Sequence, residues 1–148
     1  MDTQLVGIEI IDTKDINVVI ETLKTYVYPK TFIGISGQMG AGKTTLISQL
    51  LKDQNVVVAS PTFSLHNAYF AFGLTIIHVD LYRLESADEI DSSGFWDLFT
   101  DQKSIILAEW IERISMDDVP LDWNLLLLKI QLQSDNQRCY SLFSYRLK

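Results

Sequence analysis

A phosphate-binding motif lies in the first third of the chain. Gly37, Gly42, Lys43 and Thr44 match the pattern G-x-x-x-x-G-K-[ST] of a P-loop. An apolar, β-branched run over residues 32–35 precedes the motif, and leucine and isoleucine at helical spacing follow it. This strand–loop–helix context is the one in which the motif binds phosphate. The competing interpretation, a chance glycine-rich turn with a surface lysine, does not account for the flanking strand and helix.

The residue types assign a function to each part of this loop. Its glycines let the backbone turn tightly and bring N–H groups against phosphate oxygens, and the helix that follows Gly42 points its positive end at the same anion. We expect Lys43 to bridge the β- and γ-phosphates and the Thr44 hydroxyl to bind Mg²⁺. The predicted nucleotide-binding residues are Gly37, Gln38, Met39, Gly40, Ala41, Gly42, Lys43, Thr44 and Thr45.

Two carboxylates close apolar runs further along the chain. Asp80 ends one predicted buried strand and Glu109 ends a second. The carboxyl ends of parallel strands meet at one edge of an open α/β sheet, so both acids should lie beside the P-loop. We therefore expect Thr44, Asp80 and Glu109 to bind magnesium. Lys43, Asp80 and Glu109 are the predicted catalytic residues, because together they can neutralise and orient a triphosphate.

Other signals around this site are less specific. The chain has no N-K-x-D tetrapeptide of the kind that common GTPases carry, which favours ATP. Thr62 could reach the γ-phosphate or Mg²⁺ as a catalytic switch threonine, or its hydroxyl could satisfy loop backbone. His78 lies within a strand pattern and is expected to be a packed histidine. Trp110 could shield the site, contact a partner or belong to the core.

Composition and charge indicate one folded domain that does not bind RNA alone. The chain has 148 residues, of which 47% are hydrophobic, so we expect residues 1–148 to form a single P-loop domain. The apolar run at 125–128 is too short to cross a bilayer, which predicts a cytoplasmic protein without membrane contact. The net charge of −7 and the lack of a Lys/Arg cluster favour indirect contact with nucleic acid, through a partner. The oligomeric state does not follow from the sequence.

The remaining segments alternate apolar runs with turn residues, which predicts an α/β fold. Strands are expected at residues 4–11, 56–59, 65–72, 74–79, 104–108, 125–132 and 139–147. Helices are expected from a cap at Asp12 or Thr13 to about residue 26, after Ser86, and over residues 95–99. The predicted fold is a P-loop NTPase three-layer sandwich with a mixed, largely parallel central sheet and antiparallel hairpin additions.

Four segments together resemble the TsaE family of small bacterial P-loop ATPases. They read GQMGAGKTT, SPTFSLHNAY, HVDLYRL and AEWIER and occur in this order within residues 31–113. The resemblance implies a Mg²⁺-dependent ATPase required for tRNA threonylcarbamoyladenosine biosynthesis. It also implies a TsaD/TsaB complex as partner, which carries out the transfer to tRNA, so that tRNA is contacted only through that complex.

The same resemblance implies roles for individual residues. Lys43 and Thr44 would bind phosphate and Mg²⁺, and Glu109 would be a Mg²⁺ ligand. Asp80 would be the catalytic or water-orienting acid, and Thr62 would belong to a switch-like loop. Family loops commonly read G-[DN]-L-G-A-G-K-T, whereas this chain carries Gln38 and Met39. Gln38 removes a carboxylate near the phosphates, which could change the rate of hydrolysis or the coupling to a partner.

Two other functions remain open at this point. A small-molecule or nucleoside kinase uses the same P-loop, but it needs an acceptor pocket and usually a lid that carries arginines. Near the predicted site the sequence offers only Arg83 and Arg113. The other alternative is a regulatory module that binds nucleotide without hydrolysing it, which Gln38 favours.

Overall fold

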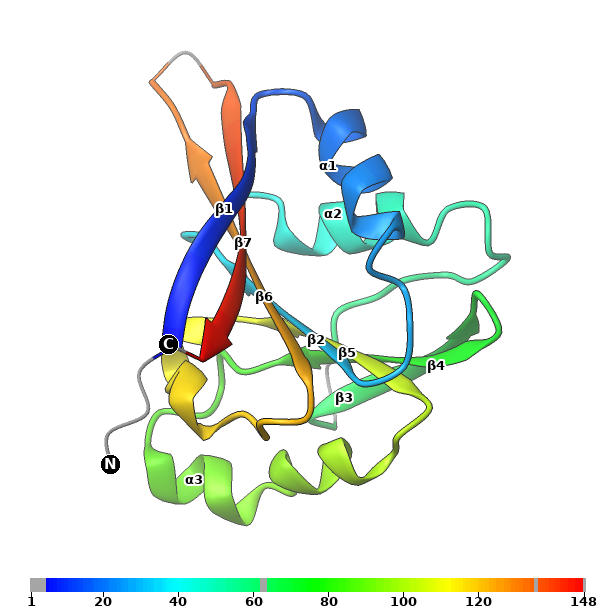
Figure 1. Cartoon of the computed structure of the whole chain (residues 1–148), viewed down its shortest axis with the longest axis vertical. Helices are drawn as coiled ribbons and strands as arrows, with labels where there is room; N and C mark the ends of the chain where they lie inside the picture. The colour runs from blue at the N-terminus through cyan, green and yellow to red at the C-terminus, as the bar shows by residue number, and fades with distance from the viewer. Residues whose placement is uncertain (1–4, 62–63, 135, 148) are drawn as a thin grey trace.

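The computed structural model describes residues 5–61, 64–134 and 136–147 of the chain. These residues form a seven-stranded sheet in the order β1-β7-β6-β2-β5-β4-β3 (Figure 1). The strands are β1 (Leu5–Thr13), β2 (Thr31–Ser36), β3 (His66–Ala71), β4 (Leu74–Asp80), β5 (Ser104–Glu109), β6 (Asn124–Leu132) and β7 (Arg138–Leu147). The central strands β6, β2, β5 and β4 are parallel, and antiparallel strands extend both sides. The predicted mixed, largely parallel sheet is confirmed.

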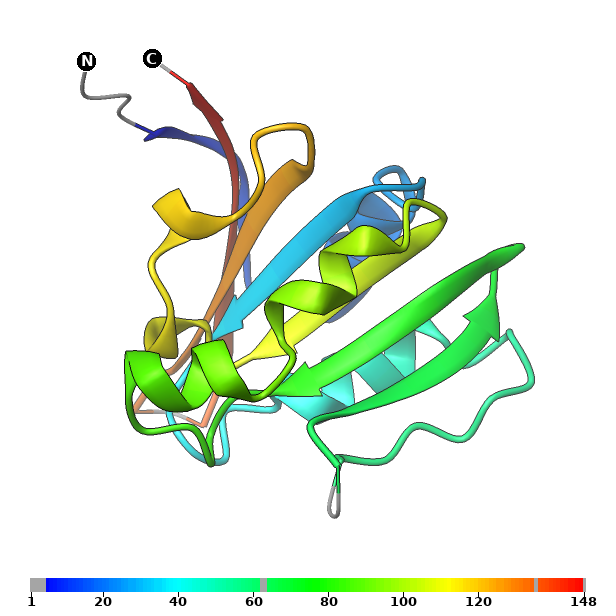
Figure 2. The same ribbon diagram turned by 90° about the horizontal axis from the view of Figure 1, so that it is seen from below.

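Helices cover both faces of this sheet (Figure 2). On one face lie α1 (Ile16–Lys24) and α2 (Lys43–Leu50), and on the other lie α3 (Ala87–Ser92) and the 3₁₀ segments Trp96–Thr100, Ile111–Arg113 and Met116–Asp118. Side chains of β2 alternate between the two cores, with Ile33 and Ile35 on the α1/α2 side and Phe32 on the other. The predicted three-layer sandwich is therefore confirmed.

Both predicted hairpins are present, and each adds an antiparallel pair to the sheet. Strands β3 and β4 turn at Phe72 and Gly73, both at positive φ, as a two-residue hairpin turn requires. Strands β6 and β7 pair from Leu125 with Tyr145 to Leu132 with Arg138. The predicted N-terminal strand is present as β1, and it lies at the edge of the sheet beside β7. No helix within the described residues has the length and apolar character needed to cross a membrane.

The prediction of a buried strand over residues 56–59 is wrong. This segment has no strand assignment, and the Val57 side chain is 90% exposed. Both neighbouring positions of β2 are filled by β5 and β6, which leaves no place for this segment among the parallel strands. Its backbone is held by side chains instead, because Tyr69 and Asn67 of β3 bind both polar backbone groups of Ala59.

The predicted start of the first helix is also wrong. Strand β1 continues through Thr13, and the helix cap is Asp15, whose Oδ1 accepts a hydrogen bond from Asn17 N at 2.9 Å. The helix ends at Lys24, two residues before the expected end. The cap of the later helix is as predicted, since the Ser86 hydroxyl accepts a hydrogen bond from Glu89 N at 3.1 Å.

Candidate nucleotide-binding site

The predicted site residues converge where β2, β4 and β5 end. Asp80 and Glu109 are register partners at the ends of β4 and β5, and Ile35 of β2 pairs with Glu109 on its other side. The P-loop leaves β2 at the same edge, so a cleft of about 380 Å³ forms between the loop and the two acids. Its lining residues are Met39, Gly40, Gly42, Lys43, Thr44, Thr45, Asp80, Tyr82, Glu109, Trp110 and Arg138.

The P-loop directs the first turn of α2 into this cleft. Gly42 caps α2 with φ = 102° and ψ = 28°, a left-handed conformation that glycine adopts without strain. The helix therefore begins at Lys43, with its positive end and its unpaired N–H groups facing the cleft. This is the geometry in which a helix N-terminus binds an anion.

Lys43 is almost completely buried, with 6% of its surface exposed. Its Nζ donates hydrogen bonds to the carbonyl oxygens of Gly37 at 2.6 Å and Gln38 at 3.0 Å. Burial lowers the pKa of the Lys43 ammonium below its ordinary value, while the carboxylates of Glu109, Glu112 and Asp80 oppose that shift. The pKa of Lys43 thus stays below its ordinary value because burial is the largest cause, and the three carboxylates limit the shift.

Trp110 forms a wall of the cleft from an unusual backbone conformation. Its φ of 60° lies in the left-handed region, where a bulky side chain is strained. The resulting chain direction places the indole 4.4 Å from Lys43 Nζ, measured to the ring centroid, and 5.0 Å from the Tyr82 ring. Trp110 thus contacts the P-loop lysine, which supports the interpretation that it shields the site.

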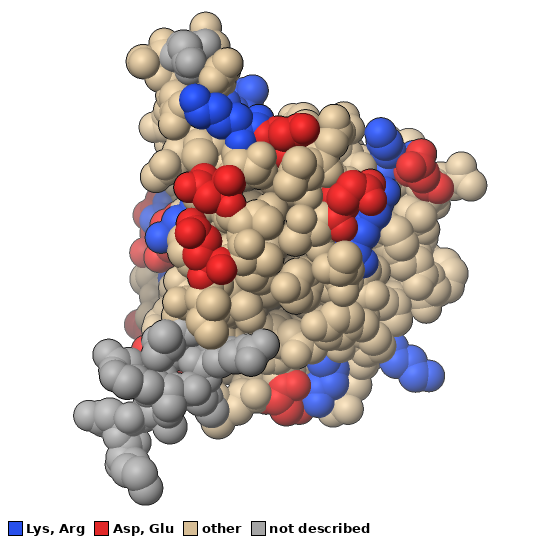
Figure 3. All heavy atoms as spheres, turned by 45° about the horizontal axis from the view of Figure 1, so that its top comes forward, with Lys and Arg blue, Asp and Glu red and all other residues tan. Residues whose placement is uncertain are grey.

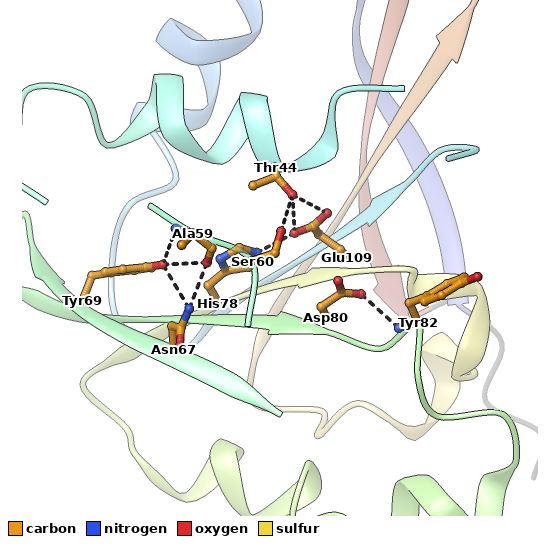
Figure 4. A network of polar contacts seen from close by, with 9 residues as sticks. All are labelled: Thr44, Ala59, Ser60, Asn67, Tyr69, His78, Asp80, Tyr82 and Glu109. Atoms are coloured by element: carbon orange, nitrogen blue, oxygen red, sulfur yellow. Dashed lines mark hydrogen bonds and ion pairs between the residues drawn. The ribbon is translucent and has the colours of Figure 1, made fainter. Parts of the chain in front are cut away.

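Glu109 is buried, and its carboxylate contacts the half-buried Thr44 hydroxyl (Figure 4). The Thr44 hydroxyl lies 3.0 Å from both carboxylate oxygens of Glu109, and it is 3.1 Å from the Ser60 hydroxyl. Glu109 Oε2 is in addition 2.5 Å from His78 Nε2. His78 is packed, as predicted, but its contact with Glu109 was not foreseen from the sequence.

Asp80 is half-buried and has a different environment. Its Oδ1 accepts a hydrogen bond from Tyr82 N at 3.0 Å, which closes a local turn after β4 (Figure 4). Asp80 also borders a neighbouring cleft of about 460 Å³ that includes Ser60 and Leu84. The structure thus places Asp80 on the open side of the site.

The sequence also predicts Thr62 and Arg113 at or near the site. Thr62 lies outside the described residues. Arg113 donates a hydrogen bond to the Tyr82 carbonyl at 3.3 Å, and it lines a groove of about 720 Å³ beside Gly37 and Gln38. Trp110 borders both this groove and the cleft beside the P-loop, so the two spaces adjoin.

Arg138 is a site residue that sequence reasoning missed. Its Nε donates a hydrogen bond to the Ala41 carbonyl at 2.7 Å, and its side chain packs against Gly42. Arg138 begins β7, almost a hundred positions after the P-loop, and no local pattern links the two. The expectation that only Arg83 and Arg113 lie near the site is therefore wrong.

The oxygen donors of this cleft suit Mg²⁺. Hydroxyl and carboxylate groups are the ligands that this hard cation prefers, and Thr44 and Glu109 present both within 3.0 Å of each other. Among the described residues no cluster of three or more His, Cys, Asp or Glu side chains could hold a metal by itself. Magnesium sites with few protein ligands normally use substrate phosphates to complete the coordination.

The fold and the loop together define an α/β protein of the P-loop class. Comparison with known families is more specific, because the model described as threonylcarbamoyl adenosine biosynthesis protein TsaE matches residues 10–140. The chain therefore belongs to the TsaE family, which is involved in the biosynthesis of threonylcarbamoyladenosine in tRNA. This confirms the resemblance found in the sequence.

Individual relatives agree with this assignment. The TsaE protein of Rickettsia conorii is 34% identical over 119 residues, which cover 78% of this chain and 65% of that protein. The TsaE protein of Borreliella burgdorferi is 33% identical over 118 residues, covering 76% of this chain and 85% of that protein. The crystal structure of YdiB from Bacillus subtilis shares the fold, with a TM-score of 0.62 at 19% identity over 97% of this chain and 88% of that one.

Proposed function

We propose that this protein is a Mg²⁺-dependent ATPase that supports tRNA threonylcarbamoyladenosine biosynthesis together with a TsaD/TsaB-type complex. The observation that carries the proposal is the convergence of Lys43, Thr44 and Glu109 at the N-terminus of α2. Membership of the TsaE family indicates the pathway, which is threonylcarbamoyladenosine biosynthesis. An ammonium, a hydroxyl and a carboxylate in one cleft are the groups that a P-loop protein uses for a magnesium triphosphate.

Each residue has a distinct task in this proposal. Lys43 and the first N–H groups of α2 would bind the phosphates, and the Trp110 indole would exclude water from Lys43. Thr44 and Glu109 would hold Mg²⁺, which supplies neutralisation of phosphate charge when bound. Asp80, on the open side of the cleft, would orient the attacking water and accept its proton.

The charge distribution supports indirect contact with tRNA. The net charge is −7, and the face drawn in Figure 3 shows Lys and Arg scattered among Asp and Glu. Strong binding to an RNA backbone needs a continuous basic surface. We therefore propose that the protein reaches tRNA through its partner complex in the cytoplasm and supplies ATP-driven turnover to that complex.

The test is ATP hydrolysis by the purified protein, alone and with the cognate TsaD/TsaB complex. We expect slow hydrolysis alone and faster hydrolysis with the complex, both lost in Lys43→Ala. Lys52→Ala, which removes an exposed lysine just after α2, is the matched control and should leave the rates unchanged. A protein that neither hydrolyses ATP nor associates with the complex would contradict the proposal. Phosphorylation of a compound from a metabolite panel would indicate a kinase instead.

A further inference from the structure

His78 makes a close contact that the proposed chemistry does not use. Its Nε2 lies 2.5 Å from Glu109 Oε2, and both side chains are buried, at 0% and 4% side-chain exposure (Figure 4). The two residues come from adjacent parallel strands, since β4 pairs with β5. His78 also shares the face of β4 on which Asp80 lies, because residues two apart in a strand point to the same side.

The surroundings of the ring assign its tautomer. His78 Nδ1 is buried and has no hydrogen-bond partner among the described residues. A proton on Nδ1 would therefore create a buried, unpaired N–H group, which is costly. The favoured form carries its proton on Nε2 and donates it to Glu109, while Nδ1 keeps only a lone pair.

This hydrogen bond limits how the Glu109 carboxylate can turn. Oε2 is held by His78 and by the Thr44 hydroxyl, whereas the Thr44 hydroxyl is the only hydrogen-bond partner of Oε1 within the described part of the chain. His78 of β4 thus holds the carboxylate on one side, and Oε1 faces the cleft beside Thr44. Carboxylates that bind metals are commonly oriented by such a partner, whose loss weakens metal affinity about 10–100-fold.

We propose that His78 is a positioning residue, whose Nε2–H orients Glu109 for the magnesium–nucleotide complex. The inference rests on the proposed function, since it concerns the same site. The competing explanation is packing alone, because the Tyr69 ring lies against His78 with 6.4 Å between ring centroids. The two explanations differ in one respect: orientation depends on a donor at the Nε2 position, whereas packing depends on volume.

Two amide substitutions separate these explanations. In His78→Gln the side-chain amide reaches the position of Nε2, and in His78→Asn it reaches only that of Nδ1. The measurement is the affinity for a fluorescent, non-hydrolysable ATP analogue, in Mg²⁺ and in EDTA. We expect His78→Asn to lose at least about tenfold in affinity in Mg²⁺ with no change in EDTA. His78→Gln should stay within about threefold of the wild-type protein under both conditions.

Controls distinguish this inference from the proposed function. Ile76→Val, a buried substitution in the same strand, should lower the unfolding temperature without changing the effect of Mg²⁺. If His78→Asn does not fold, His78→Leu replaces it as the variant without a donor. Equal losses in Mg²⁺ and EDTA, or equal behaviour of the Gln and Asn variants, would overturn the positioning role while leaving nucleotide binding intact. A wild-type protein that does not bind the analogue would overturn the proposed function as well.

Discussion

The ends of β4 and β5 carry equivalent acids in different surroundings. Asp80 and Glu109 are paired in register, and both follow apolar strands. Glu109 is buried, and its carboxylate contacts Thr44 and His78. Asp80 is half-buried, and the Tyr82 backbone is its hydrogen-bond donor. Neighbouring positions on one sheet edge thus hold one fixed and one accessible carboxylate.

This difference fits the division of tasks that we propose for the two acids. A metal ligand benefits from a fixed orientation, which Glu109 obtains from contacts on two elements. A residue that orients water must be open to it, as Asp80 is beside two clefts. The contrast arises from the sheet, since β5 lies between β2 and β4 whereas β4 adjoins the edge strand β3.

Asp80→Asn should give the largest effect, and it tests the catalytic role that we propose for the accessible acid. The Asn oxygen can still accept the hydrogen bond from Tyr82 N, so the local turn should persist. We expect partner-stimulated hydrolysis to fall about 10²–10⁴-fold, because the proton acceptor is lost. Affinity for the ATP analogue should stay within about threefold. Single-turnover kinetics and analogue titration check both values, and an unchanged rate would exclude Asp80 as the general base.

Glu109→Gln tests the proposed role of the buried acid as a Mg²⁺ ligand. The amide retains the size of the side chain but removes the charge that attracts Mg²⁺. We expect affinity for the analogue in Mg²⁺ to fall at least about tenfold, which corresponds to about 1.4 kcal/mol. Affinity in EDTA should not fall, since Lys43 and the α2 N-terminus remain. Equal affinities of the variant and the wild-type protein in Mg²⁺ would show that Glu109 is not a ligand.

A change of side-chain length at each acid tests whether Glu109 is more constrained in position than Asp80. Glu109→Asp withdraws the carboxylate by one methylene from His78 and Thr44, so we expect about a fivefold loss of affinity in Mg²⁺. Asp80→Glu should cost affinity less than about twofold, because the half-buried side chain can adjust. The measurement is the same titration in Mg²⁺. Similar losses in both variants would show that the two strand ends are equally constrained.

Arg138→Ala should have a modest effect on nucleotide affinity that does not depend on the metal. It removes the hydrogen bond to the Ala41 carbonyl and the contact with Gly42. A bond of about 1 kcal/mol predicts about a fivefold loss of analogue affinity, equal in Mg²⁺ and EDTA. Lys52→Ala controls for the loss of one positive charge. A loss confined to Mg²⁺ would instead place Arg138 with the metal-binding residues.

The local parts of this fold could be predicted from the sequence. The P-loop, the hairpin turn at Gly73 and the Ser86 cap each depend on a few neighbouring residues. The conformation of residues 56–59 could not be predicted, because their apolar pattern fits a buried strand as well as it fits the irregular segment in the structure. Val56 and Val58 pack against the core, but the positions beside β2 are occupied by other strands. Which segments become strands of the sheet therefore depends on the whole chain.

The candidate site shows the same limit, because contacts between distant segments cannot be predicted from local sequence. Asp80 and Glu109 could be located because they end apolar strands, and the structure brings both to the P-loop. Arg138 could not, since its contact with Ala41 depends on how the β6–β7 hairpin folds back. His78 had one usable signal: it stands two residues before Asp80 and therefore shares its face.

The most direct test is calorimetric titration of a non-hydrolysable ATP analogue into the wild-type protein and Lys43→Ala, with and without Mg²⁺. We predict that the wild-type protein binds one analogue per chain, more tightly in Mg²⁺, and that Lys43→Ala weakens binding about 100-fold or more, or about 2.7 kcal/mol. Binding of equal strength to Lys43→Ala, or no binding to the wild-type protein, would contradict a magnesium–nucleotide site at the P-loop.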